Sequence, residues 1–192
     1  PAFNFVYEAN IRYLHHLGEV TYFSPLADTS LPDAGFVYLP GGYPELYLAA
    51  LSANRQMLQS IRRYVESGGK LLAECGGMMY LCDEIRDKNG DVYPMAGVLH
   101  QSATMENMKL RLGYRTLLYN ETRLKGHEFH YSRLVEQQNP LPSCAVAYTA
   151  KGVETDTPLY HYKNVWAGYT HLYWADPVGN EWFTKFVIDG NT

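Results

Sequence analysis

Short apolar runs alternate with amphipathic segments along the first half of the chain. The runs at 20–24, 35–40 and 69–74 carry apolar, β-branched or aromatic side chains between Gly, Pro or Ser residues, as buried strands do. Residues 8–18 and 54–69 instead place apolar side chains at helical spacing and end in glycine, which predicts two helices. Strands that alternate with helices of this length predict a doubly wound α/β unit with a mainly parallel sheet.

The second half of the chain is richer in strand patterns. A run at 143–150 predicts one more strand, and several aromatic, partly alternating segments predict antiparallel strands or loops beside the parallel core: YRTLLY, LKGHEFHYSRL, PLYHYKN and VWAGYTHLYW. A closing helix is predicted near the C-terminus, with Asp176 as its N-cap, Pro177 at its first position and Gly190 beyond its end.

Length, charge and cysteine content narrow the class of protein. The 192 residues predict a single domain, and the formal net charge of -4 without a basic block excludes a nucleic-acid or polybasic membrane surface. The longest apolar runs are shorter than the ~18 residues that a membrane span needs, and the N-terminal residues lack a signal-peptide pattern, so we expect a cytoplasmic protein. The three cysteines are too few and too scattered for a disulfide framework or a structural zinc site.

Cys75 lies between the predicted strand at 69–74 and a predicted helix that begins at Gly76. A side chain in such a turn projects beyond the carboxyl edge of the sheet, where ligands of α/β proteins bind. The helix N-terminus would lower the pKa of the thiol, and the N–H of Gly76 could stabilise an oxyanion. The alternative is a buried, unreactive thiol beside a glycine turn. Cys82 and Cys144 are predicted to be core residues.

A second glycine turn follows the strand at 35–40. Gly41 and Gly42 form the turn, and Pro44 and Glu45 are predicted to begin a helix. The backbone N–H groups of Gly42 and Tyr43 could complete an oxyanion hole beside Cys75, although an ordinary strand-to-helix loop also favours these residue types. No Gly-Lys-Ser/Thr sequence follows, so a phosphate-binding loop is not predicted.

His171 is the first candidate for a catalytic base. A strand is predicted to end at 168–169, which places His171 on a loop at the same sheet edge as Cys75. A second polar cluster contains His127, Glu128 and His130, and strand alternation puts Glu128 and His130 on one face. A metal site is not predicted there, because no further ligand stands at metal-binding spacing.

Four segments together are similar to one known family. FSPLADTSLPDAGFVYLPGGYPELY, AECGGMMYLC, GHEFHYS and GYTHLYW, in this order and spacing, resemble the glutaminase domain of cobyrinic acid a,c-diamide synthases, which are class I glutamine amidotransferases of cobamide biosynthesis. The resemblance runs across almost the whole chain. It implies a flavodoxin-like, doubly wound, mainly parallel sheet with an antiparallel, aromatic-rich extension, formed as one domain by residues 1–192.

The resemblance also implies residue roles. Cys75 would attack the side-chain amide carbon of glutamine, and His171 would activate the thiol and pass a proton to the departing ammonia. Gly76 and the region of Gly42 and Tyr43 would form the oxyanion hole. Two further residues, Glu128 and His130, would shape the glutamine site or a domain interface, or form a structural hydrogen-bonded pair.

In that family this domain needs no cofactor or metal of its own. Ammonia passes to an N-terminal synthetase domain, which uses ATP and Mg²⁺ to amidate two acetate side chains of cobyrinic acid. The present sequence has no phosphate-binding motif, so we expect the synthetase domain to lie outside these 192 residues and to be the partner of this domain.

The sequence departs from the wider pattern in two ways. Tyr173 stands where class I amidotransferases commonly have a glutamate, two residues after the histidine, which leaves the orientation of His171 open. The family normally has a first strand just before residues 2–5, and its absence would leave sheet edges unpaired. The alternatives are the related enzyme that amidates a nickel tetrapyrrole, a non-catalytic module that binds a synthetase, and another cysteine hydrolase of the same fold.

Overall fold

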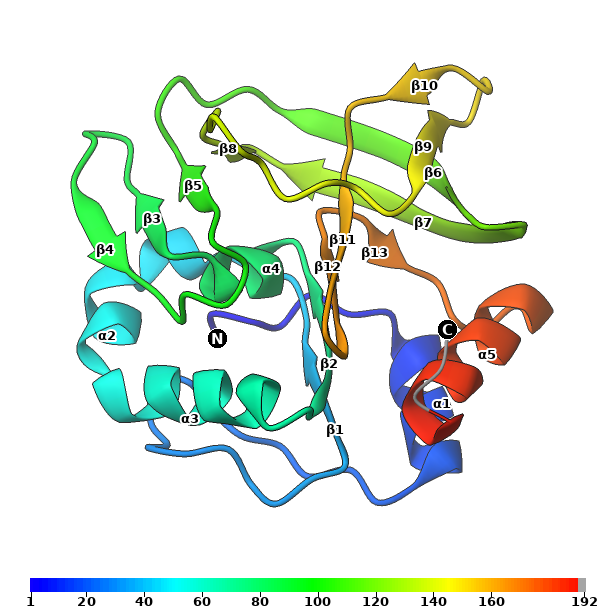
Figure 1. The fold of residues 1–192 in the computed structure, drawn as a ribbon, viewed down its shortest axis with the longest axis horizontal. Helices are drawn as coiled ribbons and strands as arrows, with labels where there is room; N and C mark the ends of the chain where they lie inside the picture. Colours follow the sequence, from blue (N-terminus) through cyan, green and yellow to red (C-terminus); the bar gives the residue numbers. More distant parts are fainter. Residues whose placement is uncertain (190–192) are drawn as a thin grey trace.

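A parallel sheet occupies the centre of the molecule in the computed structural model, which describes residues 1–189 (Figure 1). Strands β1 (Phe36–Leu39), β2 (Lys70–Glu74) and β12 (Val165–Gly168) run parallel, and β11 (Leu159–Tyr162) pairs with β12 in the antiparallel sense. The order across the sheet is β1-β2-β12-β11. The predicted strands at 35–40 and 69–74 are therefore confirmed, and both end at the edge of the sheet that carries the candidate site.

Helices cover both faces of this sheet. On one face lie α2 (Leu48–Ala53), α3 (Arg55–Glu66) and the short α4 (Gly76–Leu81), while α1 (Glu8–Leu17) and α5 (Pro177–Thr184) lie side by side against the other (Figure 1). The sheet residues alternate accordingly: Leu71 and Ala73 join the first core, and Leu72 joins the second. The doubly wound arrangement predicted from the sequence is confirmed.

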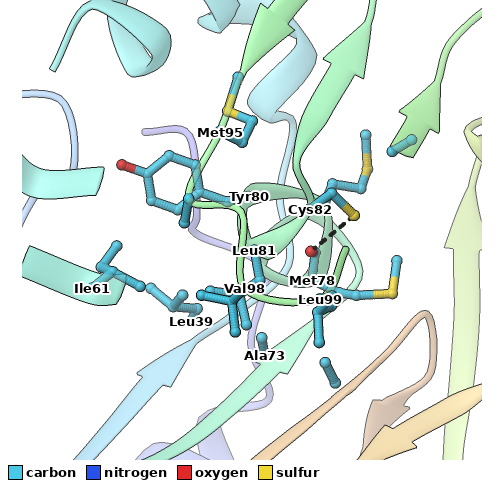
Figure 2. Packing of buried hydrophobic residues seen from close by; sticks show 14 of the residues in the cluster. Leu39, Ile61, Ala73, Met78, Tyr80, Leu81, Cys82, Met95, Val98 and Leu99 are labelled. Atoms are coloured by element: carbon cyan, nitrogen blue, oxygen red, sulfur yellow. Dashed lines mark hydrogen bonds between the residues drawn. The ribbon is translucent and has the colours of Figure 1, made fainter. Parts of the chain in front are cut away.

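Helix α4 is apolar on every side because it is enclosed by the sheet, α3 and the following loops (Figure 2). Its residues 76–81 are all buried. Cys82, at its C-terminal end, is fully buried, and its thiol donates to the Met78 carbonyl oxygen. This agrees with the prediction that Cys82 is a core residue, whereas Cys144 is only partly buried and bonds to the Leu159 carbonyl oxygen.

A five-stranded antiparallel sheet of order β10-β9-β6-β7-β13 packs beside the central sheet and forms the predicted extension (Figure 1). Its strands are β6 (Arg111–Tyr119), β7 (Thr122–His130), β9 (Val146–Thr149), β10 (Glu154–Thr155) and β13 (His171–Leu172). A third sheet of order β4-β3-β5-β8, which no sequence pattern predicted, is made of short strands: β3 (Glu84–Arg86), β4 (Val92–Pro94), β5 (Ser102–Thr104) and β8 (Arg133–Leu134).

Two strand predictions require correction. Residues 20–24 form no strand, and the run at 143–150 contributes β9 to the antiparallel sheet rather than a buried strand of the parallel one. A cavity of about 920 Å³ is lined by residues 20–24 and by β1, among others. Within residues 1–189, β1 pairs with β2 alone and residues 20–24 pair with no strand, so the backbone hydrogen bonds that would make these residues a strand are missing.

The closing helix begins as predicted. Asp176 accepts a hydrogen bond from the Gly179 N–H at 2.7 Å, and Pro177 is the first helical residue of α5. The chain then continues through a π-helical segment, Lys185–Asp189, and the predicted stop at Gly190 lies outside the described residues. The 3₁₀ turn at Pro44–Leu46 likewise starts where a helix was predicted. No helix in the described part of the chain is long and apolar enough to cross a membrane.

Candidate active site

Cys75 occupies a sharp turn between β2 and α4. Its backbone angles, φ 48° and ψ −108°, lie in a region that non-glycine residues rarely adopt, and its N–H donates to the Gly168 carbonyl oxygen at 2.8 Å. Gly77 allows the close approach that follows, because a Cβ there would come within 2.1 Å of the Leu39 carbonyl oxygen. The strand–turn–helix context predicted around Cys75 is therefore present, with the side chain at the carboxyl edge of the sheet.

The Cys75 thiol is 5% exposed, and burial raises its pKa to about 12. The N–H of Gly76 acts in the opposite direction, while the carboxylates of Glu45, Glu74 and Glu128 raise the pKa further. The N–H at the start of α4 thus acts in the predicted direction, but the net pKa is raised, because desolvation of the thiolate outweighs a single N–H of a short helix. The protonated thiol lies 3.9 Å from the Phe129 carbonyl oxygen, to which it donates.

The loop at Gly41 and Gly42 lies directly against the start of α4. A Cβ placed on Gly76 would lie 3.0 Å from the carbonyl oxygen of Gly42 and 3.2 Å from its nitrogen. Gly42 itself has φ +151°, which favours glycine, and Tyr43 follows as a half-exposed residue. The structure thus brings Gly42 and Gly76 together, while the role of their N–H groups in an oxyanion hole stays a prediction.

His171 lies at the same edge as Cys75, three residues beyond the end of β12. It does not lie on a loop, as predicted, but in β13, where His171 and Leu172 pair with His127 and Gly126 of β7. These two residues pair with β7 and so form a strand at the end of the five-stranded antiparallel sheet. The His171 ring touches the glycine turn, since a Cβ on Gly41 would come within 2.1 Å of its Cε1 atom.

Aromatic rings enclose the His171 imidazole. The His127 ring stacks on it with centroids 5.1 Å apart, and the Phe5 ring meets it edge-on at 4.7 Å. Burial lowers the pKa of His171 to about 3, and the charges that His127 and His130 can carry lower it further. Its Nδ1 atom is buried without a hydrogen-bond partner among the described residues. The imidazole is therefore neutral near pH 7, and the same burial makes its protonation unfavourable in this structure.

Sequence reasoning missed the residues that surround His171. The N-terminal segment crosses the site: Phe5 donates its N–H to the Gly41 carbonyl oxygen at 3.0 Å, and the Tyr7 hydroxyl forms a short hydrogen bond with Nδ1 of His127. Glu74, directly before Cys75, is buried and bonds to the backbone of Leu172. The sequence shows only that a carboxylate stands next to Cys75, because these contacts join residues between 36 and 120 positions apart.

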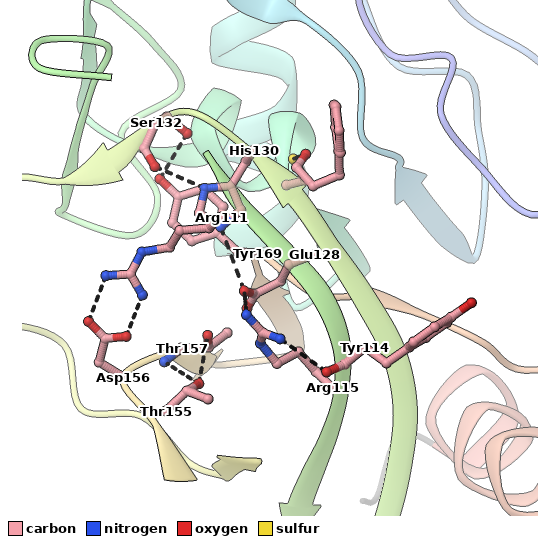
Figure 3. Close-up of polar contacts among 12 residues, drawn as sticks. Arg111, Tyr114, Arg115, Glu128, His130, Ser132, Thr155, Asp156, Thr157 and Tyr169 are labelled. Atoms are coloured by element: carbon pink, nitrogen blue, oxygen red, sulfur yellow. Dashed lines mark hydrogen bonds and ion pairs between the residues drawn. The ribbon is translucent and has the colours of Figure 1, made fainter. Parts of the chain in front are cut away.

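Glu128 and His130 lie on one face of β7, as strand alternation predicted, and both are buried (Figure 3). Glu128 forms an ion pair with Arg115 at 2.8 Å, and His130 stacks on Tyr169 with ring centroids 3.8 Å apart. His130 also donates from Nδ1 to the Ser132 carbonyl oxygen. The 3.9 Å between His130 Nε2 and Glu128 Oε2 is too long for the direct hydrogen bond of a structural pair.

The opposite face of β7 carries His127, which faces His171. Glu128 and His130 therefore do not contact the catalytic histidine candidate, although Glu128 is close enough to raise the pKa of Cys75. Within residues 1–189, no group of three or more His, Cys, Asp or Glu side chains is arranged to hold a metal ion. The arrangement of a cysteine, a neutral imidazole and backbone N–H groups suits acyl transfer through a covalent cysteine intermediate.

Comparison with known proteins identifies a family for this chain. Residues 1–178 match the family of CobB/CobQ-like glutamine amidotransferase domains. The chain is 39% identical over 178 residues to a hydrogenobyrinate a,c-diamide synthase of Pseudomonas aeruginosa, covering 90% of this chain and 39% of that protein. It is 38% identical over 197 residues to a cobyrinate a,c-diamide synthase of Clostridium acetobutylicum, covering 97% of this chain and 43% of the relative. The chain thus spans about two fifths of the length of these relatives.

Solved structures show the same fold. A crystal structure of a glutamine amidotransferase superposes with a TM-score of 0.59 at 17% sequence identity, covering 93% of this chain and 92% of the other. A chain of the PurLQS structure from Thermotoga maritima gives a TM-score of 0.56 at 16% identity, covering 94% and 89%. The fold is therefore that of class I glutamine amidotransferases, as predicted.

Proposed function

Since the chain belongs to the family of CobB/CobQ-like glutamine amidotransferase domains, we propose that it hydrolyses glutamine through Cys75 and supplies the ammonia for a corrin a,c-diamide synthase. The observation that carries this proposal is the meeting of three parts at the Gly41–Gly42 turn. The His171 ring packs on Gly41, Gly42 packs on Gly76, and Cys75 directly precedes Gly76. The nucleophile and the base candidates thus flank the same turn.

The proposed reaction begins with a protonated thiol. The Cys75 hydrogen leaves the Phe129 carbonyl oxygen and passes to the neutral His171 ring as the sulfur attacks the amide carbon of bound glutamine. The N–H groups of Gly76 and Gly42 stabilise the oxyanion that forms on the amide oxygen. His171 then gives the proton to the leaving nitrogen, ammonia departs, and a glutamyl thioester stays on Cys75. Water hydrolyses the thioester to glutamate and restores the thiol.

The names of the related proteins indicate which group the ammonia would amidate. Those compared above are named cobyrinate or hydrogenobyrinate a,c-diamide synthases, so we propose that the a and c carboxyl groups of a corrin are amidated, and the nickel tetrapyrrole alternative is not favoured. A synthetase domain would bind ATP, Mg²⁺ and the corrin and activate the carboxyl groups. The present chain would bind glutamine and lie against that domain.

Labelling with 6-diazo-5-oxo-norleucine, a glutamine analogue that alkylates an activated thiol, tests the glutaminase proposal. We expect mass spectrometry to find the adduct on Cys75 alone, with Cys82 and Cys144 as internal controls. Excess glutamine should protect Cys75, and His171→Ala should slow the labelling strongly while leaving a measurable rate. Equal labelling of all three cysteines, or none on a folded chain in which glutamine is also not hydrolysed, would contradict the proposal.

A further inference from the structure

Strand β13, which carries His171, is an edge strand whose outer side is completed by side chains instead of a further strand. The inner side of β13 pairs with β7. On the outer side, the Leu172 N–H donates to Oε1 of Glu74 at 3.0 Å, and the Leu172 carbonyl oxygen accepts from Nδ2 of Asn10 at 2.7 Å. Both backbone groups next to His171 are therefore held by buried polar side chains from other parts of the fold.

Glu74 is itself fixed in place. It ends β2, where it pairs with Gly168 of the neighbouring strand, and it is 2% exposed. Its second carboxyl oxygen accepts a hydrogen bond from the Tyr38 hydroxyl at 2.5 Å. Glu74 thus connects the end of the parallel sheet to the backbone of the residue after His171, while Cys75 directly follows Glu74 in the chain.

Among residues 1–189, the His171 ring has no acidic partner. Nδ1 is buried without a hydrogen bond among the described residues. Tyr173, which stands two residues after His171, packs edge-on against Tyr7 with ring centroids 5.4 Å apart. The orientation of the imidazole therefore depends on the stacked rings around it and on the backbone that carries it.

We propose that Glu74 is a positioning residue, which orients His171 toward Cys75 through the Leu172 N–H rather than through the imidazole ring. The inference rests on the proposed glutaminase function. A misplacement of about 1 Å at a reacting group can reduce a rate by two orders of magnitude, so one backbone hydrogen bond beside the base can matter for turnover. Glu74 connects the turn at Cys75 to β13, the strand that carries His171, so that the two move together.

Two variants separate the hydrogen-bond acceptor at position 74 from the ionisable carboxyl group. In Glu74→Gln, the side-chain oxygen still accepts from Leu172 and the amide donates to the Tyr38 oxygen, so kcat for glutamine hydrolysis should stay within about threefold of the unmodified chain. Glu74→Met keeps the length but loses the acceptor, and kcat should fall about 10–100-fold, as losses of supporting hydrogen bonds at active sites do, with KM changed less than about threefold. Tyr38→Phe is the matched control, because it breaks only the other hydrogen bond of Glu74.

A double variant shows whether Glu74 acts through His171. The rate of Cys75 alkylation by 6-diazo-5-oxo-norleucine should fall in Glu74→Met, but adding Glu74→Met to His171→Ala should cause no further fall. A merely structural role, or an effect on the Cys75 turn itself, would slow the double variant further. That result, or an unchanged kcat in Glu74→Met, would overturn the proposal.

Nuclear magnetic resonance distinguishes this proposal from the proposed function. The Leu172 amide proton and the His171 ring protons should shift in Glu74→Met and keep their positions in Glu74→Gln. If the unmodified chain neither hydrolyses glutamine nor is alkylated, the glutaminase proposal fails, whatever the spectra show. If it is active but the His171 ring signals of Glu74→Met are unchanged, the positioning role of Glu74 fails and the function stands.

Discussion

The backbone of Gly41 lies against the imidazole of His171, so closely that a methyl group on Gly41 would come within 2.1 Å of the ring carbon Cε1. This contact joins the turn after β1 to the strand that carries the base candidate. The ring cannot retreat freely, because His127 and Phe5 cover its other sides. The position of the imidazole therefore depends on the absence of a side chain at residue 41.

Gly41→Ala should displace the His171 ring and lower the rate of glutamine hydrolysis at least about tenfold, because the added methyl group overlaps ring atoms that are enclosed by other rings. Gly35→Ala is the matched control, since a Cβ there meets nothing within 4 Å. Steady-state kinetics on both variants checks the prediction. Equal activity of the two would mean that the ring position in the structure is not the one used in turnover.

The buried carboxyl of Glu74 predicts a pH-dependent stability. Burial raises its pKa to about 8. Between the ordinary pKa of a glutamate and about 8, the folded chain keeps a proton that the unfolded chain has lost, so the free energy of unfolding falls as the pH rises through this window. Glu74→Gln should remove this contribution, which is on the order of 2 kcal/mol between pH 6 and pH 8.5.

Denaturant unfolding at the two pH values measures the effect as a difference between the unmodified chain and Glu74→Gln. The exposed Glu136 supplies a control, because Glu136→Gln should leave the pH dependence of the unmodified chain almost unchanged. An identical pH dependence in the unmodified chain and in Glu74→Gln would show that Glu74 ionises normally in the folded state.

The Cys75 thiol should react slowly with reagents that carry no glutamine-like group. Burial raises its pKa to about 12, so at pH 8 the reactive thiolate is scarce, and alkylation by iodoacetamide should be at least about tenfold slower than for free cysteine. The glutamine analogue should react much faster, because it brings the reacting carbon beside His171, the proposed base. Mass spectrometry of Cys75 with time under each reagent tests this, and faster iodoacetamide labelling would show that a thiolate is present before substrate binds.

The sharp turn at Cys75, between β2 and α4, could be predicted from the sequence because the residues that determine it are close together in the chain. An apolar run, a cysteine and two glycines within a few residues determine a strand, a turn and a helix start. His171 could be placed at the right edge from the end of β12 alone. Its strand could not be predicted, since β13 exists only through pairing with β7, more than forty residues earlier.

The thiol pKa could not be predicted for a related reason. The local sequence shows the helix N-terminus beside Cys75, but not the strand β7 that crosses the site and brings the Phe129 carbonyl oxygen to the sulfur. Desolvation depends on such long-range packing, as do the contacts of Tyr7 with His127 and of Glu74 with Leu172. Likewise, residues 20–24 have a strand-like composition, but they pair with no strand in the described part of the chain.

The backbone conformation of Cys75 means that the fold would be more stable without a side chain at the position of the proposed nucleophile. A non-glycine residue at φ 48° and ψ −108° costs on the order of 1–3 kcal/mol, which a glycine would avoid. Cys75→Gly should therefore unfold at a higher temperature than Cys75→Ala, the reverse of the usual order for these two residues. Calorimetry of the two variants checks this. Such an order would identify position 75 as one at which selection for stability and selection for chemistry oppose each other.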